Sequence, residues 1–167
     1  IADIGGLYAR FAIETSYGEF AQQRSLRCAD FPSFEAAMSA YLGSLKSAAV
    51  AHAAVAIANP VDGDQVRMTN YHWQFSIEET RANLGLETLV VVNDFTSLAM
   101  ALPRLSATDF RQVGTGQAVK NSVIGLIGSG SGLGVSGLIP SGEGWTSLGS
   151  EGGHASFAPA DAREAAV

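Results

Sequence analysis

Residues 1–12, IADIGGLYARFA, place an acidic residue and two adjacent glycines between two apolar segments. Apolar segments on either side of a short glycine turn are typical of two paired strands. The turn itself has two open interpretations. Gly5 and Gly6 supply the positive φ of a tight hairpin, or their backbone N–H groups, with no side chain in the way, form a concave site for an anion such as phosphate.

The same pattern recurs near the other end of the sequence. Apolar segments 123–127 and 135–139 flank the glycine-rich run 128–134, and a third segment, 145–148, follows after a Ser-Gly turn. These segments predict a second meander, just as segment 19–28 adds a third strand to the first one. Two glycine turns of this kind predict two backbone sites that face one ligand.

Helix and strand signals alternate between the two meanders. Helix signals lie at 34–45 and 76–84, and strand signals lie at 55–58 and 89–92. Ser33 is placed to start the first helix, Ser76 with Glu79 forms a capping-box signature for the second, and Gly85 ends it. The continuous apolar run at 89–92 predicts a strand covered on both faces. The alternation predicts an α/β protein.

Composition excludes several kinds of partner. The 167 residues have the length of one globular domain, and the net charge is −6 with ten dispersed Lys and Arg residues, which argues against nucleic-acid binding. The most apolar run, 48–58, is too short to cross a bilayer, so no membrane partner is expected. A single cysteine, Cys28, fits a reducing compartment, and we expect a cytoplasmic protein.

The segment LVVVNDFTS places Asn93 and Asp94 directly after the predicted strand 89–92. Ligands of open α/β sheets bind outside the carboxyl ends of the strands, where a carboxylate can take a proton from a substrate. The alternative is that Asp94 only caps a helix over 95–102. The sequence leaves both interpretations open.

The segment SLGSEGGH brings Glu151 and His154 together around two glycines. A carboxylate accepts hydrogen bonds, whereas an imidazole both donates and accepts, so the pair suits a ligand with several hydroxyl groups. The alternative is a loop with a solvated glutamate. Trp73, in NYHWQFS, is expected to be a core or domain-seam residue.

Five segments, in this order, resemble the bacterial hexokinase-type glucokinases of the actin-like ATPase superfamily. They are ADIGG with ARFA, AIANPVDGDQVRMTNYHWQFSI, VVNDFTSLAMALP, GSGSGLGVS and GSEGGHASFAP. The competing sugar-kinase and repressor family carries a cysteine-rich zinc motif after its histidine, and no such motif follows His154.

The resemblance implies a ribonuclease H-like lobe of the actin type, with a mixed five-stranded sheet flanked by helices. It implies that residues 1–167 are the small N-terminal lobe of a two-lobe sugar kinase whose C-terminal lobe is absent from this chain. The missing initiator Met and the end of the chain about one turn after Asp161 and Glu164 lead to the same expectation of a fragment.

For the sugar, the resemblance implies that Asp94 is the general base for the glucose 6-hydroxyl. Asn93 would hold a neighbouring hydroxyl, and Glu151 and His154 would hold hydroxyls on the other side of the ring. The same family is often dimeric, so a homodimer is possible.

For the nucleotide, the resemblance implies ATP and Mg²⁺ as cofactors. Asp3 would lie near the magnesium ion, through water. The residues that would face the phosphates are Gly5, Gly6, Leu7, Gly130, Ser131 and Gly132. The family usually has Thr and Asn after the glycine pair, where this chain has Leu7 and Tyr8. We expect this departure to impair nucleotide binding.

The function that follows from the resemblance is a glucokinase, an ATP-dependent enzyme that converts glucose to glucose 6-phosphate at the entry to glycolysis. The fragment alone is expected to be inactive. The alternative is a non-catalytic sugar-binding or regulatory relative with an impaired ATP site. In a third class, a purely structural interaction domain, Asn93, Asp94, Glu151 and His154 would not face one cleft.

Overall fold

The computed structural model describes residues 1–45, 49–69, 71–129, 132–156 and 158–166. The chain forms two compact units, Ile1–Leu98 and Ala99–Val167. Each unit has its own sheet, and the two are described in turn. The prediction that residues 1–167 make up one lobe of a two-lobe protein stays a prediction.

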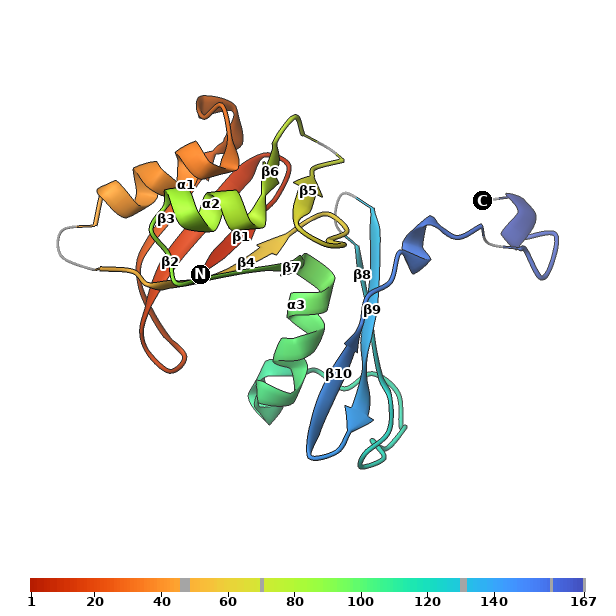
Figure 1. Ribbon diagram of the computed structural model, residues 1–167. Helices are drawn as coiled ribbons and strands as arrows, with labels where there is room; N and C mark the ends of the chain where they lie inside the picture. Colours follow the sequence, from red (N-terminus) through yellow and green to blue (C-terminus); the bar gives the residue numbers. More distant parts are fainter. Residues whose placement is uncertain (46–48, 70, 130–131, 157, 167) are drawn as a thin grey trace. The chain divides into compact units, whose positions relative to one another are not determined.

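The first unit is built on a mixed five-stranded sheet with the strand order β3-β2-β1-β4-β7 (Figure 1). Its strands are β1 (Ala2–Ile4), β2 (Tyr8–Ser16), β3 (Glu19–Arg27), β4 (His52–Ile57) and β7 (Thr88–Asn93). The pairs β1–β2 and β2–β3 are antiparallel, whereas β1–β4 and β4–β7 are parallel. The predicted α/β class, mixed sheet and first meander are confirmed.

Two helices and a small hairpin pack on this sheet. They are α1 (Phe34–Gly43), α2 (Ile77–Asn83), β5 (Gln65–Arg67) and β6 (Gln74–Ser76). The side chain of Ser33 caps α1, and that of Ser76 caps α2 by accepting the N–H of Glu79 at 3.0 Å. Gly85 has a φ of 66°, a left-handed conformation that suits a helix end. Both predicted helix starts are confirmed.

Both helices lie on one face of the sheet and bury a single apolar cluster there (Figure 1). Alternate residues of the strands point into it, including Ile4, Val55 and Ile57, which are at most 1% exposed. Trp73 is also buried, and its indole N–H donates to the carbonyl of Phe31 at 3.2 Å. Trp73 is therefore a core residue, as expected.

The prediction that the strand at 89–92 is covered on both faces is wrong for this unit. Leu89 and Val91 are buried, but Val90 between them is 48% exposed. Successive side chains of a strand point to opposite faces. Because α1 and α2 pack on one face, the continuous apolar run alternates between a covered and an open face.

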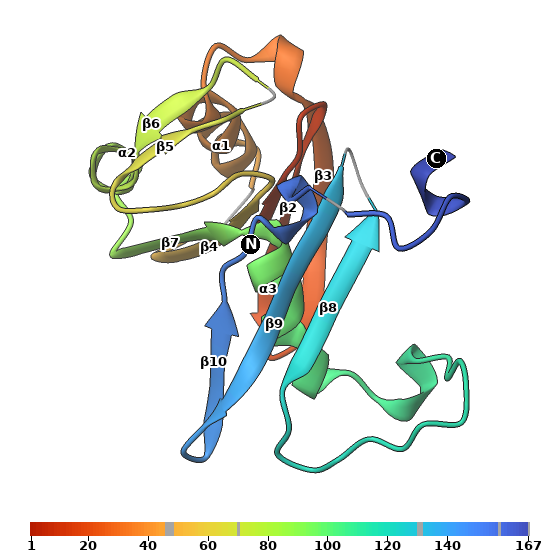
Figure 2. The same ribbon diagram turned by 90° about the vertical axis from the view of Figure 1, so that its right-hand side faces the viewer.

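The second unit contains an antiparallel meander in the order β10-β9-β8 (Figure 2). Its strands are β8 (Ile124–Ser129), β9 (Leu133–Ser141) and β10 (Gly144–Leu148), which confirms the predicted second meander. Leu138 is fully buried, and the hydroxyl of Ser136 donates to the carbonyl of Leu148 at 2.8 Å.

One further α-helix and several 3₁₀ turns complete the elements. Helix α3 (Asp94–Ala101) begins in the first unit and ends in the second. The 3₁₀ turns are η1 (Cys28–Asp30), η2 (Leu102–Arg104), η3 (Ala107–Asp109), η4 (Gly152–His154) and η5 (Glu164–Ala166). None of the helices in the described ranges has the length and apolar character needed to cross a membrane.

Candidate functional site

Asn93 links the end of strand β7 to the start of helix α3. Its side-chain Oδ1 accepts the N–H of Thr96 at 3.1 Å, three residues further on. That is the bond of an N-cap residue. The cap of α3 is therefore Asn93, and the interpretation that Asp94 is only the cap is wrong.

The carboxylate of Asp94 is oriented by two donors. The N–H of Phe95 donates to its Oδ1 at 2.9 Å, and the Nδ2 of Asn93 donates to the same oxygen at 3.1 Å. Among the described residues, no hydrogen bond ends on its Oδ2. One oxygen is thus held by the protein, and the other can accept a hydrogen bond from a ligand.

The pKa of the Asp94 carboxyl is raised above its ordinary value, mainly because burial disfavours the charged form. The negative charge of Asp3 raises it further, while the N–H of Phe95 and the amide of Asn93 oppose the rise. A carboxylate with a raised pKa is a stronger base near neutral pH than an ordinary aspartate.

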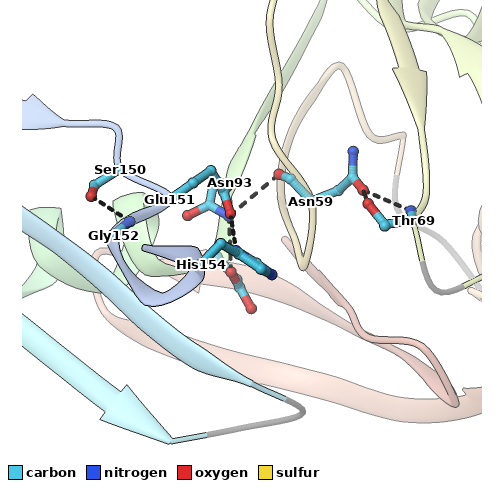
Figure 3. A network of polar contacts seen from close by, with 8 residues as sticks. Asn59, Thr69, Asn93, Ser150, Glu151, Gly152 and His154 are labelled. Carbon is cyan, nitrogen blue, oxygen red and sulfur yellow. Dashed lines mark hydrogen bonds and ion pairs between the residues drawn. The ribbon is translucent and has the colours of Figure 1, made fainter. Parts of the chain in front are cut away.

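A hydrogen-bonded group that the sequence analysis did not single out lies beside Asn93 in the first unit. Asn59 lies two residues after the end of strand β4, and its carbonyl accepts the Nδ2 of Asn93 at 3.3 Å. Its side-chain Oδ1 accepts both the N–H and the hydroxyl of Thr69, at 2.8 and 2.6 Å (Figure 3). The sequence offered a weak signal, because Asn59 lies just past the end of β4 and Asn93 is the last residue of its parallel neighbour β7, but that placement does not by itself predict the contact.

Asp3 and Arg10 form a cross-strand ion pair between β1 and β2. The Nη1 of Arg10 lies 2.8 Å from the Oδ2 of Asp3, and both side chains are about half exposed. Asp3 also acts electrostatically on Asp94, so the structure places these two carboxylates in one neighbourhood. Within the described residues, no group of three or more His, Cys, Asp or Glu side chains could hold a metal ion.

The first glycine turn does not need glycine for its backbone conformation. Neither Gly5 nor Gly6 has a positive φ, so the hairpin interpretation that requires one is wrong. A Cβ at Gly5 would meet only the carbonyl of Tyr8, at an ordinary 3.6 Å. The other interpretation, that the absence of side chains lets an anion approach the backbone, stays a prediction. Leu7, which follows, is 78% exposed.

The second glycine turn is only partly described. Gly130 and Ser131, both predicted to face phosphates, lie outside the described residues. Gly132 directly precedes β9 and is exposed, and a Cβ there would meet no atom within 4 Å. The predicted role of this turn stays a prediction.

Glu151 and His154 form a hydrogen-bonded pair in the second unit. The Nδ1 of His154 lies 3.0 Å from the Oε2 of Glu151, with the side chains 80% and 50% exposed respectively (Figure 3). Gly153 between them cannot carry a side chain, because a Cβ would lie 1.6 Å from the carbonyl oxygen of Leu133 on β9. Glycine is needed here so that η4 can pack directly on the strand.

The structure thus brings Asn93, Asp94 and Asp3 together in the first unit, and Glu151 with His154 in the second. The prediction that both groups face one ligand stays a prediction. The roles predicted for these residues in binding sugar and in catalysis also stay predictions.

These features define a class of protein, an α/β protein of the actin-like type with a carboxylate at the carboxyl end of a parallel strand. The chain belongs to the glucokinase family, whose model, described as Glucokinase, matches residues 1–167.

Known relatives agree with this membership. The chain is 60% identical to the bifunctional protein glk of Paraburkholderia xenovorans over 98% of its length, and covers 26% of that protein. It is 51% identical to the glucokinase of Chromobacterium violaceum over its full length, and covers 48% of that enzyme. The chain therefore spans about half or less of the relatives it matches.

A solved structure confirms the fold. The crystal structure of glucokinase from an Antarctic psychrotroph superposes with a TM-score of 0.81 at 35% sequence identity. The match covers 98% of this chain and 53% of that one.

Proposed function

We propose that the full-length protein is a glucokinase that transfers the γ-phosphoryl group of ATP to the 6-hydroxyl of glucose. In this proposal residues 1–167 are the N-terminal part of a two-lobe kinase. The family membership and the 49–51% identity to two bacterial glucokinases support the reaction class.

The observation that carries the proposal is the state of Asp94. It lies at the carboxyl end of β7, has one oxygen held by Asn93 and Phe95, and has a raised pKa. A base that takes a hydroxyl proton needs this combination of fixed geometry, a free oxygen and adequate basicity. A residue that only capped a helix would need neither a free oxygen nor a raised pKa.

The proposed reaction follows from that geometry. The Oδ2 of Asp94 takes the proton of the glucose 6-hydroxyl as its oxygen attacks the γ-phosphorus, and the bond between that phosphorus and the β,γ-bridging oxygen breaks to leave ADP. Phosphoryl transfer asks the protein mainly for positioning and charge neutralisation. Glu151 and His154 supply one acceptor and one donor–acceptor group for other sugar hydroxyls.

The nucleotide side of the site fits ATP with Mg²⁺. A carboxylate oxygen is a ligand of the kind magnesium prefers, and Mg²⁺ is commonly held by one or two carboxylates together with substrate phosphates. Asp3 offers its Oδ1, since Arg10 contacts the Oδ2. When bound, the ion neutralises charge on the phosphates. Gly132 leaves room for a phosphate beside its backbone, because a Cβ there would meet no atom within 4 Å.

The second candidate is a sugar-binding relative that does not transfer phosphate. The observation that favours it is Leu7, which stands 78% exposed directly after the glycine pair, where the family usually has a threonine. An apolar side chain there donates no hydrogen bond to a phosphate and takes up space beside the turn.

The two candidates are separated by a coupled assay of ADP formation on the full-length protein. We expect ADP formation that requires both glucose and Mg²⁺, and none from purified residues 1–167 alone. Glucose binding by calorimetry without any ADP formation would reject the kinase in favour of the sugar-binding relative.

A further inference from the structure

We propose that Asn59 and Thr69 are positioning residues for the Asp94 carboxylate, and that they act through Asn93. The inference rests on the proposed role of Asp94 as the base and adds two residues to that site. Every contact that carries it lies within the first unit.

The side chain of Asn59 joins two segments that are ten residues apart. It is 7% exposed, and its Oδ1 accepts both the N–H and the hydroxyl of Thr69. Its Nδ2 donates to the carbonyl of Pro60 at 2.9 Å. Buried amides of this kind are costly to leave unpaired, so these bonds hold the backbone that follows β4 in one conformation.

That backbone holds Asn93. Ile57 and Asn93 are register partners in the parallel pair β4–β7, so the carbonyl of Asn59 lies beside the Asn93 side chain. The Nδ2 of Asn93 donates to this carbonyl and to the Oδ1 of Asp94, while its own Oδ1 accepts the N–H of Thr96. Both ends of the amide are thereby engaged, which fixes its orientation.

The Asn59–Asn93 contact affects the orientation of the Asp94 carboxylate. One of the two donors to Asp94 is an amide whose orientation depends on the carbonyl of Asn59. Small misplacements of a reacting group cost large factors in rate, and groups behind a site commonly set its geometry. Loosening the Asn59–Thr69 contact is therefore expected to lower turnover while leaving the binding of glucose nearly unchanged.

The test compares Thr69→Val with Thr69→Ser in the full-length protein. Valine keeps the β-branched shape and removes the hydroxyl, whereas serine restores it. We expect Thr69→Val to lower kcat by about 10- to 100-fold with the KM for glucose changed less than about threefold, and Thr69→Ser to recover most of kcat.

The matched control is Thr88→Val. Thr88 lies at the other end of strand β7, where its hydroxyl is 3.2 Å from the Nδ1 of His52. We expect Thr88→Val to retain wild-type kcat. Equal losses in Thr69→Val and Thr88→Val, or a kcat for Thr69→Val equal to that of the wild type, overturn the proposal.

A second measurement does not depend on activity. The Nδ2–H signals of Asn93 are identified in the amide spectrum by their loss in Asn93→Asp. We expect these signals to shift in Thr69→Val and to stay in place in Thr69→Ser and Thr88→Val. If the wild type forms no ADP, the proposed function fails. The positioning role is tested separately: Asn93 signals that do not move in Thr69→Val overturn it, and signals that move support it.

Discussion

Asp94 in the first unit and the pair Glu151 and His154 in the second differ in how the protein holds them. Asp94 is partly buried, and two donors hold one of its oxygens. Glu151 and His154 are largely exposed, and the hydrogen bond between their side chains is the side-chain contact that fixes them. We infer that the carboxylate of Asp94, the proposed base, is held in place before any ligand binds, whereas Glu151 and His154, the proposed sugar ligands, would be fixed when sugar binds.

This difference predicts that Asp94 acts mainly on turnover. Asp94→Asn in the full-length protein keeps the side-chain size and removes the base, so we expect kcat to fall by about 10² to 10⁴ while the KM for glucose changes little. Initial rates of ADP formation check it. Asp62→Asn, an exposed residue in the segment after β4, is the control. Turnover close to the wild type would exclude Asp94 as the base.

The exposed pair is predicted to act mainly on sugar affinity. A hydrogen bond to a charged group contributes about 1.5–3 kcal/mol, so Glu151→Ala is expected to raise the dissociation constant for glucose by about 10- to 150-fold. Calorimetric titration of the full-length protein measures it. Glu143→Ala, in the exposed turn between β9 and β10, serves as the matched control. An unchanged glucose affinity in Glu151→Ala would remove this residue from the sugar site.

The residues after the first glycine pair are predicted to weaken nucleotide binding. A lost contact to phosphate costs about 1–3 kcal/mol of binding free energy. The double variant Leu7→Thr with Tyr8→Asn introduces the residues that the family usually has, and it is expected to lower the KM for ATP by about 5- to 150-fold. The surface change Val113→Thr should leave it unaltered. If the double variant keeps the wild-type KM for ATP, Leu7 and Tyr8 do not impair the nucleotide site.

The smallest predicted effect is on stability. Because burial raises the pKa of Asp94 in the folded state, that state binds the proton more tightly than the unfolded chain does. Stability contributed by this group is therefore present below the unfolded pKa and falls as pH rises through the folded value. We expect Asp94→Asn to be more stable than the wild type near pH 7, with the gap closing as pH falls toward about 4.

Denaturant midpoints of the two proteins across this pH range measure the stability effect. A wild type that is as stable as Asp94→Asn at every pH would show that the charge of Asp94 carries no cost in the fold.

Much of the fold was predictable because its signals are local. Ser33 and Ser76 mark helix starts by hydrogen bonds within three residues, and the two meanders follow from apolar segments between turns. The site was predictable where it follows a strand directly, as at Asn93 and Asp94.

What the sequence did not reveal depends on contacts between distant segments. The bond from Thr69 to Asn59 and the bond from Asn93 to the Asn59 carbonyl join three segments that are far apart in the sequence, and no spacing rule predicts them. The exposure of Val90 likewise depends on which face of the sheet the helices occupy. That neither Gly5 nor Gly6 has a positive φ also required the structure.

The most direct test of the central claim is a crystal structure of the full-length protein with glucose bound. The account predicts the glucose 6-hydroxyl within about 2.6–3.2 Å of the Asp94 carboxylate, with the amide of Asn93 still donating to Asp94 Oδ1. A sugar whose 6-hydroxyl points away from Asp94, or an Asp94 carboxylate that contacts only protein or bulk water, would contradict it.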